Sequence, residues 1–266
     1  RDNYSNAYTA GDHTNYQLQV LPDGFEGAID RFAQFFISPL FTSEYTAREV
    51  NAVNSEHQKN IMNDNWRQYR ITSQFVKKGH PAGKFGTGSL ETLGDITREE
   101  LVEFYNTQYS ENRMGLALLS THSLDEMEAW TRQYFSDVKN HNLERTKHDP
   151  NVFEKKETFR FVQIDPVKDL RDLEISFATP STRHMYKSKP GRQLGFILGH
   201  EGKGSLLSYL KDKGWAQTLS AGARPATKEY GGVTIRIGLT PKGQEDYKEI
   251  VLATLDYIEL MKESGH

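Results

Sequence analysis

The chain reads Thr46-Ala-Arg-Glu-Val-Asn-Ala-Val-Asn-Ser-Glu-His-Gln-Lys-Asn-Ile-Met-Asn-Asp-Asn-Trp-Arg67 in the middle of a stretch, Ser43 to Lys78, that contains neither Gly nor Pro. Residues that favour a packed face recur in it at steps of three to five, as they do along an amphipathic helix. They are Val50, Val53, His57, Ile61, Trp66 and Tyr69. The pattern predicts one long helix from Ser43 to Lys78.

Two carboxylates lie inside this predicted helix. Glu49 and Glu56 are seven positions apart, so they project within about 20° of each other, two turns apart on one face. The same face carries Ala52 and Val53, and we therefore expect both acids at the edge of a buried stripe. A carboxylate in such a place needs a partner, which is a helix cap, a base or a metal.

Composition excludes several classes of function. The 266 residues carry 33 Lys+Arg against 36 Asp+Glu, and a net charge of -3 gives no electrostatic reason to expect nucleic acid or an anionic membrane as partner. The longest apolar runs, such as 115–119, are too short to span a bilayer. There is no Cys, hence no disulfide and no thiolate ligand. Because the chain opens on Arg1 without an initiator Met, we expect it to be a piece of a longer polypeptide.

Outward from the long helix, periodicity and turn residues predict further elements. Strands are expected at Ser5 to Ala10, Thr14 to Leu21, Met114 to Ser120, Phe159 to Ile164, Leu173 to Phe177, Thr218 to Ala221 and Gly232 to Leu239. Helices are expected at Gly24 to Ser38, Thr97 to Gln108, Leu124 to Val138, Arg192 to Leu198, Ser205 to Lys213 and Gly243 to Lys262. A capping box, Thr97-Arg-Glu-Glu100, marks one helix start. The mixed order of strands and helices predicts an α+β fold.

A polar stretch without periodicity, Lys139 to Lys156, indicates a domain boundary. We expect residues 1–145 to be the remainder of a first domain, 146–157 to be a linker and 158–266 to be the start of a second, similar domain. Each is expected to be a mainly antiparallel sheet with helices packed on one side, the first truncated at its N-terminus and the second incomplete. No repeat at the level of residues supports a duplication.

Six separated blocks of sequence, in a constant order, carry a family resemblance. They are Ser5-Asn-Ala-Tyr-Thr9, Arg31-Phe-Ala-Gln-Phe-Phe36, Arg48-Glu-Val-Asn-Ala-Val-Asn-Ser-Glu56, Lys84-Phe-Gly-Thr-Gly88, Pro166-Val-Lys-Asp-Leu-Arg171 and His200-Glu-Gly-Lys-Gly-Ser-Leu-Leu207. Together they resemble the insulin-degrading enzyme and pitrilysin group of zinc metallopeptidases, the inverzincins, over nearly the whole chain.

The resemblance implies a zinc site to which this chain gives one ligand. In that family two His of a His-x-x-Glu-His helix and a Glu on a later helix hold the metal, which activates a water, and the Glu of the motif is the general base. Glu56 matches the later Glu, and Glu49 matches a second acid that supports catalysis. No two of the nine His are four residues apart, so the motif is not in this sequence. Zinc is therefore expected in the complete enzyme and not in this chain alone.

Other matches imply peptide binding. The strand that contains Asn6, Ala7 and Tyr8 resembles an edge strand along which the family adds its substrate as a further β-strand. The resemblance places two aromatic residues near the cleavage pocket and four residues on a distal surface that captures the N-terminus of the substrate. They are Trp66 and Tyr69 for the pocket and Gly199, Glu201, Leu219 and Ala221 for the distal surface. Arg192 and Phe196 stand where close relatives have His, a departure that affects specificity.

Structural roles are open alternatives for most of these residues. Glu49 would be the third helical residue of a capping box if Thr46 capped the helix, and Glu56 would be an ordinary carboxylate on a helix flank. A lone His such as His57 or His200 is more often hydrogen-bonded or solvated than a ligand. Trp66 and Tyr69 would more often be packing residues. The glycines of 202–204 lack the spacing of a phosphate-binding loop.

The sequence therefore predicts a zinc-dependent endopeptidase of short polypeptides, of which this chain is an inactive part without the His-x-x-Glu-His motif and the C-terminal half. The alternative is a non-catalytic member of the family, or a scaffold, that binds extended peptides without cleaving them. The physiological substrate and the oligomeric state are left open by the sequence. The compartment is also open, with the periplasm expected if the source is a Gram-negative bacterium.

Overall fold

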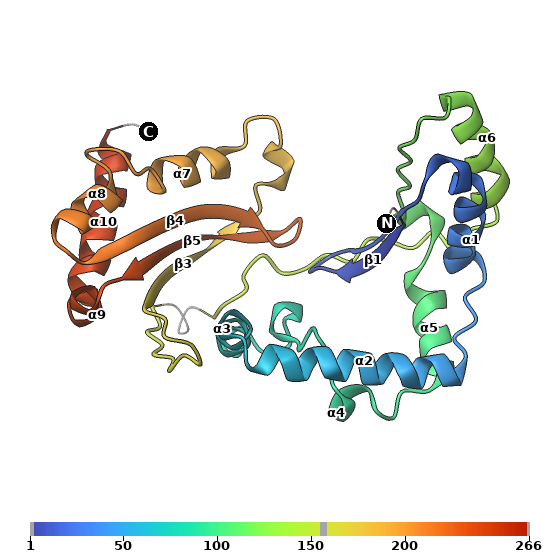
Figure 1. Ribbon diagram of the computed structural model, residues 1–266, viewed down its shortest axis with the longest axis horizontal. Helices are drawn as coiled ribbons and strands as arrows, with labels where there is room; N and C mark the ends of the chain where they lie inside the picture. Colours follow the sequence, from blue (N-terminus) through green and yellow to red (C-terminus); the bar gives the residue numbers. More distant parts are fainter. Residues whose placement is uncertain (1–2, 155–158, 265–266) are drawn as a thin grey trace. The chain divides into compact units, whose positions relative to one another are not determined.

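A computed structural model describes residues 3–154 and 159–264 of the chain (Figure 1). Its contacts divide the chain into two compact units. Unit 1 consists of Arg1–Ile61 and Phe85–Lys147, and unit 2 consists of Met62–Lys84 and His148–His266. The segment Met62–Lys84, which the sequence placed with residues 1–145, therefore belongs by its contacts with unit 2. Whether the units fold as separate domains with a linker at 146–157 stays a prediction.

Unit 1 begins with the expected hairpin. β1 (Tyr4–Thr9) pairs antiparallel with β2 (Thr14–Gln19), and the Ala10 N–H donates to the His13 carbonyl across the turn at 2.8 Å. The helices of this unit are α1 (Phe25–Ile37), α2 (Ser43–Ile61), α4 (Leu90–Leu93), α5 (Arg98–Gln108) and α6 (Leu124–Phe135), with short 3-10 helices at Pro22–Gly24 and Glu111–Arg113. The capping box of α5 is confirmed, because Thr97 and Glu100 each accept the backbone N–H of the other.

Aromatic side chains hold β2, α1 and α5 of unit 1 together. The Tyr16 and Tyr109 hydroxyls are 2.5 Å apart, and the Tyr105 hydroxyl donates to the Phe36 carbonyl at 2.5 Å. Burial, followed by the bond to Tyr16, raises the pKa of Tyr109 well above its ordinary value. Ala33, on the same helix as Phe36, is fully buried. Phe36 and Ala33 thus lie on the packing face of α1, whereas Phe35 is 56% exposed.

The predicted single helix from Ser43 to Lys78 is wrong. α2 ends at Ile61, and a separate helix, α3 (Asp64–Ser73), begins after an extended Asn63 whose side chain accepts the N–H groups of Asn65 and Trp66. The Asn63-Asp64 pair supplies a cap and an acidic first turn, which together favour a new helix start over continuation. The periodicity runs through the break and conceals it.

Two predicted strands, Met114 to Ser120 and Phe159 to Ile164, are also wrong. Both segments lie in the described residues and neither is a strand there. The chain from 111 to 120 is mostly exposed, with Leu119 at 94%. An apolar run becomes a strand only where a neighbouring strand accepts its backbone hydrogen bonds. The two-stranded sheet of unit 1 does not extend to this run in the part of the chain that the structure describes.

Unit 2 is built on an antiparallel sheet of three strands in the order β3-β5-β4. The strands are β3 (Asp172–Pro180), β4 (Ala216–Pro225) and β5 (Tyr230–Leu239). The helices of the unit are α3, α7 (Pro190–Leu198), α8 (Leu206–Asp212), α9 (Pro241–Glu245) and α10 (Tyr247–Glu263), with short 3-10 helices at Pro81–Gly83 and Arg183–Met185. Antiparallel strands and separate helices confirm the α+β class.

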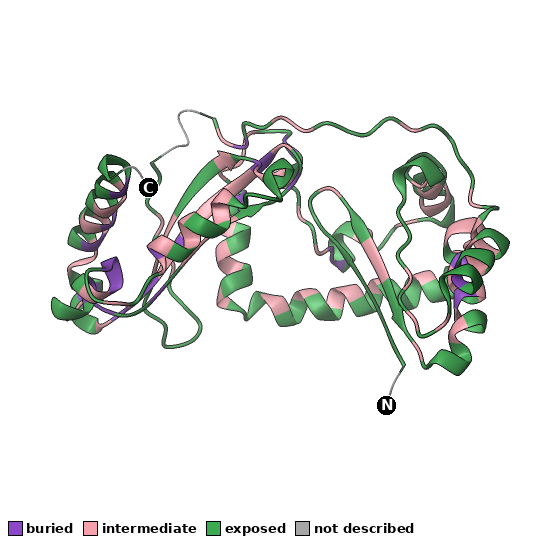
Figure 2. Cartoon of the chain, turned by 90° about the horizontal axis from the view of Figure 1, so that it is seen from above, coloured by how far each residue is buried: buried purple, intermediate pink, exposed green. Residues whose placement is uncertain are grey.

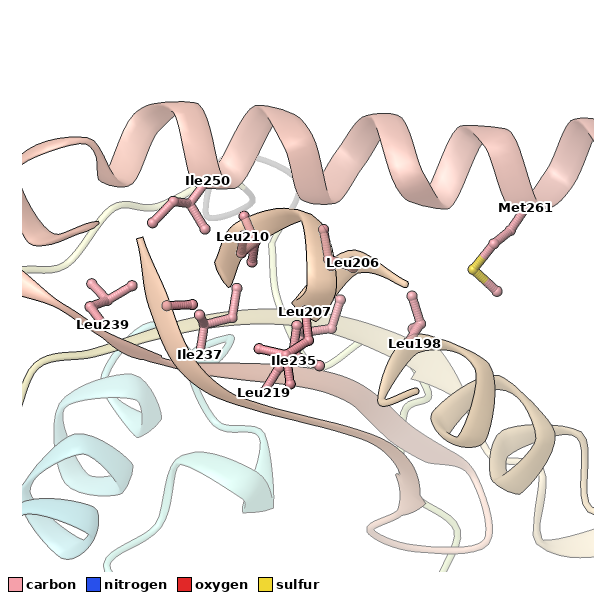
Figure 3. Close-up of a cluster of buried hydrophobic side chains, with 11 residues drawn as sticks. Leu198, Leu206, Leu207, Leu210, Leu219, Ile235, Ile237, Leu239, Ile250 and Met261 are labelled. Carbon is pink, nitrogen blue, oxygen red and sulfur yellow. The ribbon is translucent and has the colours of Figure 1, made fainter. Parts of the chain in front are cut away.

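The core of unit 2 lies on one face of this sheet. Leu219 of β4 is opposite Ile237 of β5, which is opposite Leu173 of β3, so apolar side chains form rows across the strands. α8 lies between the sheet and α10 and fills the space with leucines (Figure 3). The opposite face is polar, as shown by the ion pair of Arg236 and Asp172 at 3.0 Å. Among the described residues, the helices that contribute to this core, α7, α8 and α10, cover the apolar face.

Burial differs along the chain (Figure 2). Unit 2 contains most of the fully buried apolar side chains, whereas α2 contains no buried residue. None of the helices in the described ranges is both long and apolar enough to cross a membrane.

Candidate functional site

Glu49 and Glu56 lie on one face of α2, as predicted. The helix begins at Ser43, and the Thr46 N–H already donates to the Thr42 carbonyl at 2.9 Å. Thr46 is thus inside the helix, which excludes a capping box with Glu49. Neither Glu49 nor Glu56 forms a hydrogen bond or ion pair with any residue that the structure describes. Both carboxylates are available to a partner.

The flank of α2 beside these acids packs against residues 85–93. The His57 ring meets the Phe85 ring edge-on with centroids 5.0 Å apart, the Asn54 Oδ1 accepts the Leu90 N–H at 3.1 Å, and Val53 lies against Gly88. Gly88 has a φ of +88°, and a Cβ there would stand 3.2 Å from Val53 Cγ1. His57 is therefore a packing residue of the Lys84-Phe-Gly-Thr-Gly88 block.

The expectation that Glu49 and Glu56 border a buried stripe is wrong for the described residues. Both acids and Ala52 are exposed, and Val53 is only half-buried. The segment 85–93 is too short to cover more than one flank of the helix, so the acid-bearing face stays open. The site therefore offers two solvated carboxylates and no low-dielectric pocket.

A zinc site needs three protein ligands gathered around one point. Within residues 3–154 and 159–264, no three side chains of His, Cys, Asp or Glu are so placed. Glu49 and Glu56 are separated along the helix by about 10.5 Å of axial rise, too far to close on one ion. The residues of this chain thus do not make a zinc site by themselves, and Glu56 fits only as one ligand among others.

Asp64 at the start of α3 binds the Pro166 block, a contact that sequence reasoning missed. Its carboxylate accepts the N–H groups of Val167 and Lys168 at 2.8 and 3.1 Å and a bond from Arg67 at 3.2 Å. Arg67 also donates to the Asp165 carbonyl at 2.9 Å. The Val167 N–H is the largest cause that lowers the pKa of Asp64 below its ordinary 3.8. The position of Asp64 directly after a helix cap is visible in the sequence. Its partner, 103 residues away, is not signalled by any local pattern.

Trp66 and Tyr69 of α3 are presented to solvent. Their side chains are 43% and 52% exposed, and the rings meet edge-to-face with centroids 6.0 Å apart. The alternative that they are core residues is therefore not supported in the described chain. An exposed aromatic pair held in one orientation is a surface on which apolar side chains can bind.

β1 has β2 on one side, and no other strand of the described chain pairs with it. All six of its residues are exposed. The Ala7 N–H donates to the Asn6 Oδ1 at 2.9 Å, and the Asn6 Nδ2 donates to the Tyr4 hydroxyl at 2.8 Å. Tyr8 packs edge-on against His13. Asn6, Ala7 and Tyr8 thus lie on a strand that pairs on one side only in the described chain. The Ala7 N–H is hydrogen-bonded to a side chain and not to another strand.

α7 lies directly on β4 through a line of glycines. A Cβ at Gly191 would lie 2.8 Å from Ala223 Cβ, and one at Gly195 would lie 3.0 Å from the Ala221 oxygen. At Gly199 it would lie 3.5 Å from the Ala221 nitrogen and 2.9 Å from the Gly195 oxygen. Only residues without a side chain permit this approach. The structure therefore brings Gly199 and Ala221 together, and their role in binding a substrate stays a prediction.

The remaining residues of the expected distal surface differ in what they can offer. Leu219 is 6% exposed and part of the core, so only its backbone can face a ligand. Glu201 is exposed just beyond α7. Phe196 is 73% exposed, and its ring lies 6.1 Å from that of His200. His200 thus touches an exposed aromatic residue, and α8 begins soon after it with Ser205 as its cap.

Comparison with known proteins places these elements in a family. Residues 95–265 match the family described as "Peptidase M16 inactive domain", and residues 3–78 match "Insulinase (Peptidase family M16)". The chain is 41% identical to the A-factor-processing enzyme of Saccharomyces cerevisiae and 40% identical to the insulin-degrading enzyme of Homo sapiens, in both cases over 98% of this chain and 26% of the relative.

The fold agrees with a solved structure of the same group. The crystal structure of pitrilysin matches with a TM-score of 0.90 at 26% identity, over 99% of this chain and 29% of that one. The chain thus spans about a quarter of the length of the curated relatives that it matches. The matched residues of the first family description alone cover more than half of the sequence. The chain belongs to peptidase family M16.

Proposed function

We propose that the complete polypeptide is a zinc-dependent endopeptidase of short polypeptides, in which Glu56 is a zinc ligand and Glu49 supports catalysis. The observation that carries the proposal is the pair of exposed carboxylates on one face of α2, without partners in the described chain. Glu100 and Asp64, which lie at helix starts, are engaged by backbone N–H groups, whereas Glu49 and Glu56 are left available in the described chain. The sequence resemblance implies that Glu56 corresponds to the family's zinc-ligating Glu and Glu49 to its supporting acid.

The peptide is bound in extended conformation in this proposal. β1 and β4 are both edge strands of the sheets in the described chain, and edge strands bind peptides through backbone hydrogen bonds with little dependence on sequence. β1 would take the segment to be cleaved through Asn6, Ala7 and Tyr8, while Trp66 and Tyr69 contact side chains near the cleaved bond. Gly199, Glu201, Leu219 and Ala221 would hold the N-terminus of the substrate.

The other ligands of the zinc would come from outside the described residues. When bound, the metal supplies a water of lowered pKa and polarises the substrate carbonyl. This chain would contribute two carboxylates. Glu56 would bind the zinc, and Glu49 would support catalysis without contacting the ion. Peptides are the partner class, and neither nucleic acid nor a membrane is required.

A second candidate is a member of the family that binds peptides without cleaving them. Its support is the description of the larger matched region as an inactive domain, together with the lack of a cluster of three metal-ligating side chains in the residues that the structure describes. The edge strands would serve equally well in such a binder.

Metal analysis of variants in the full-length protein separates these functions. Glu56→Gln is expected to abolish tight zinc binding. Glu49→Gln is expected to retain most of the zinc and to lower kcat by 100-fold or so, in the range of a general acid–base contribution. Glu44→Gln is the matched control, an exposed acid of the same helix on a different face. Full zinc occupancy in Glu56→Gln would overturn the assignment, and a wild-type protein with neither zinc nor activity would establish the second candidate.

A further inference from the structure

The region between Ile175 and His200 contains no Asp and no Glu. Its basic residues gather before and within α7 and are exposed. They are Arg183, Lys187, Lys189 and Arg192. In these 26 residues every Asp, Glu, Lys or Arg position is basic, although the charge of the whole chain is close to balanced. The stretch therefore creates a local positive potential.

The packing of α7 on β4 places a further basic residue, Arg224, near the N-terminal end of α7. Because Gly191 lies against Ala223, the first turn of α7 lies beside the last residues of β4, where Arg224 is exposed. Lys189 is the cap residue of α7, with a left-handed φ of 49°. Lys189, Arg192 and Arg224 make no ion pair within the described ranges of the chain.

Helical phase places Arg192 at the open edge of β4. Going around α7 at 100° per residue, Leu198 faces the core, the three glycines face β4, and Arg192 and Phe196 follow on the side beyond the strand. Arg224 alternates with Ala223 along β4, so its side chain leaves on the opposite, polar face of the sheet. The two arginines therefore flank the edge of β4 from its two faces.

The other end of the same edge is acidic. Glu201 follows α7, is exposed, and has no ion-pair partner among the described residues. Leu219 and Ala221, the strand residues expected to hold the amine, precede Arg224 by five and three positions. An extended peptide along this edge therefore reaches Arg224 with about its fourth to sixth residue. The edge thus has a carboxylate at one end and cations at the other, with the span of a short peptide segment between them.

We propose that this edge selects peptides that carry Asp or Glu about four to six residues from a free N-terminus. The amine binds at the Glu201 end, and the acidic side chains reach Arg192 and Lys189 on one side of the strand and Arg224 on the other. This inference rests on the proposed capture of the substrate N-terminus at β4 and adds the class of substrate. Alternation of side chains along a strand lets adjacent acidic residues use both arginines.

The expected size of the effect follows from exposed ion pairs. Each such pair changes binding by a factor of about 1.5 to 5 at moderate ionic strength, so two or three together give about tenfold. The preference should weaken as salt rises, because the charges are solvated. Apolar packing of the peptide on Phe196 is independent of charge and should not change with salt.

The test uses the full-length protein and pairs of peptides that differ only by Glu or Gln at residues 4 to 6. Wild-type protein should bind the Glu peptide about tenfold more tightly, and the triple variant Lys189→Gln, Arg192→Gln, Arg224→Gln should reduce that ratio to near one while binding of the Gln peptide is unchanged. Lys203→Gln is the control, an exposed cation next to Glu201, and should leave the ratio intact. A wild-type ratio near one, or a ratio that survives the triple variant, overturns the inference.

Acetylating the peptide N-terminus distinguishes failure of the inference from failure of the proposed function. If acetylation weakens binding of both peptides but the Glu to Gln ratio is one, N-terminal capture stands and the acidic preference is refuted. If acetylation has no effect on either peptide, capture at β4 is itself refuted and the inference falls with it.

Discussion

The helix α2 and the α7–β4 pair each present residues with an expected function, and they do so by opposite means. α2 offers side chains, the carboxylates of Glu49 and Glu56, from a helix that buries nothing in the described chain. β4 offers backbone, because Leu219 is in the core and Ala221 is covered by a glycine. A side-chain site tolerates changes around it and fails when one residue is replaced. A backbone site tolerates changes of side chain and fails when the packing beneath it moves.

The largest expected effect of a substitution is on stability, in the core below β4. Ile235→Ala removes a side chain with no exposure and should lower the free energy of unfolding by about 3 to 4 kcal/mol, the usual cost of such a cavity. Val53→Ala on α2 removes a half-buried side chain and should cost less than about 1 kcal/mol. Urea unfolding of both variants measures the difference, and equal losses would refute the contrast between the two regions.

The next effect concerns the glycine line. Gly195→Val pushes a side chain onto the Ala221 oxygen and the Gly222 Cα, which a Cβ would approach to 3.0 and 3.2 Å, and we expect a loss of about 2 to 3 kcal/mol from overpacking. Gly222→Val is the control in the same pair of elements, because a Cβ there has no atom within 4 Å. A stable Gly195→Val variant with unchanged peptide binding would show that α7 can leave β4 without consequence.

A smaller, pH-dependent effect is expected from Asp64. Its pKa is lowered in the folded chain relative to the ordinary value of 3.8, so it contributes stability above pH 3.8 that is lost as the pH falls through the folded value. Asp64→Asn should therefore be less stable than the wild type at neutral pH, and the difference should shrink below about pH 4. Unfolding midpoints from pH 3 to 7 test this, and a difference independent of pH would mean that the charge of Asp64 is not the cause.

The smallest effect on stability is expected from proteolytic cleavage between the predicted domains, because such a cut leaves the core contacts intact. Limited proteolysis should cut within Lys139 to Lys156 before it cuts either flank, because the stretch is polar and lacks regular structure in its described part. Equal protection along this stretch would indicate one continuous domain and would weaken the comparison of two separate units.

Local rules predicted much of this fold. The hairpin of β1 and β2, the capping box of α5 and all three strands of unit 2 were placed from alternation, turn residues and caps. The same rules failed at Asn63, where a helix start lies inside an unbroken periodicity, and at Met114 to Ser120, where no strand in the described part of the chain pairs with the apolar run. The difference is that a cap or a turn is complete within a few residues, whereas pairing needs a partner from elsewhere.

The candidate site divides in the same way. The common face of Glu49 and Glu56 follows from helical spacing alone, and the roles assigned to them come from the family resemblance. The exposure of these acids, the clamp of Asp64 on Val167 and Lys168, and the burial of Leu219 did not follow from any local pattern. Each depends on which distant segment covers the residue.

The sequence by itself determined the α+β class, the family and the helical phase of the two acids, because composition, periodicity and motif spacing are properties of neighbouring residues. Only the tertiary structure decided that Met62–Lys84 packs with unit 2, that the acid face of α2 stays open in the described chain, and that Gly191 and Gly195 let α7 lie directly on β4. These depend on backbone approach and burial between segments far apart in the chain, where a few ångströms of packing distance decide what touches.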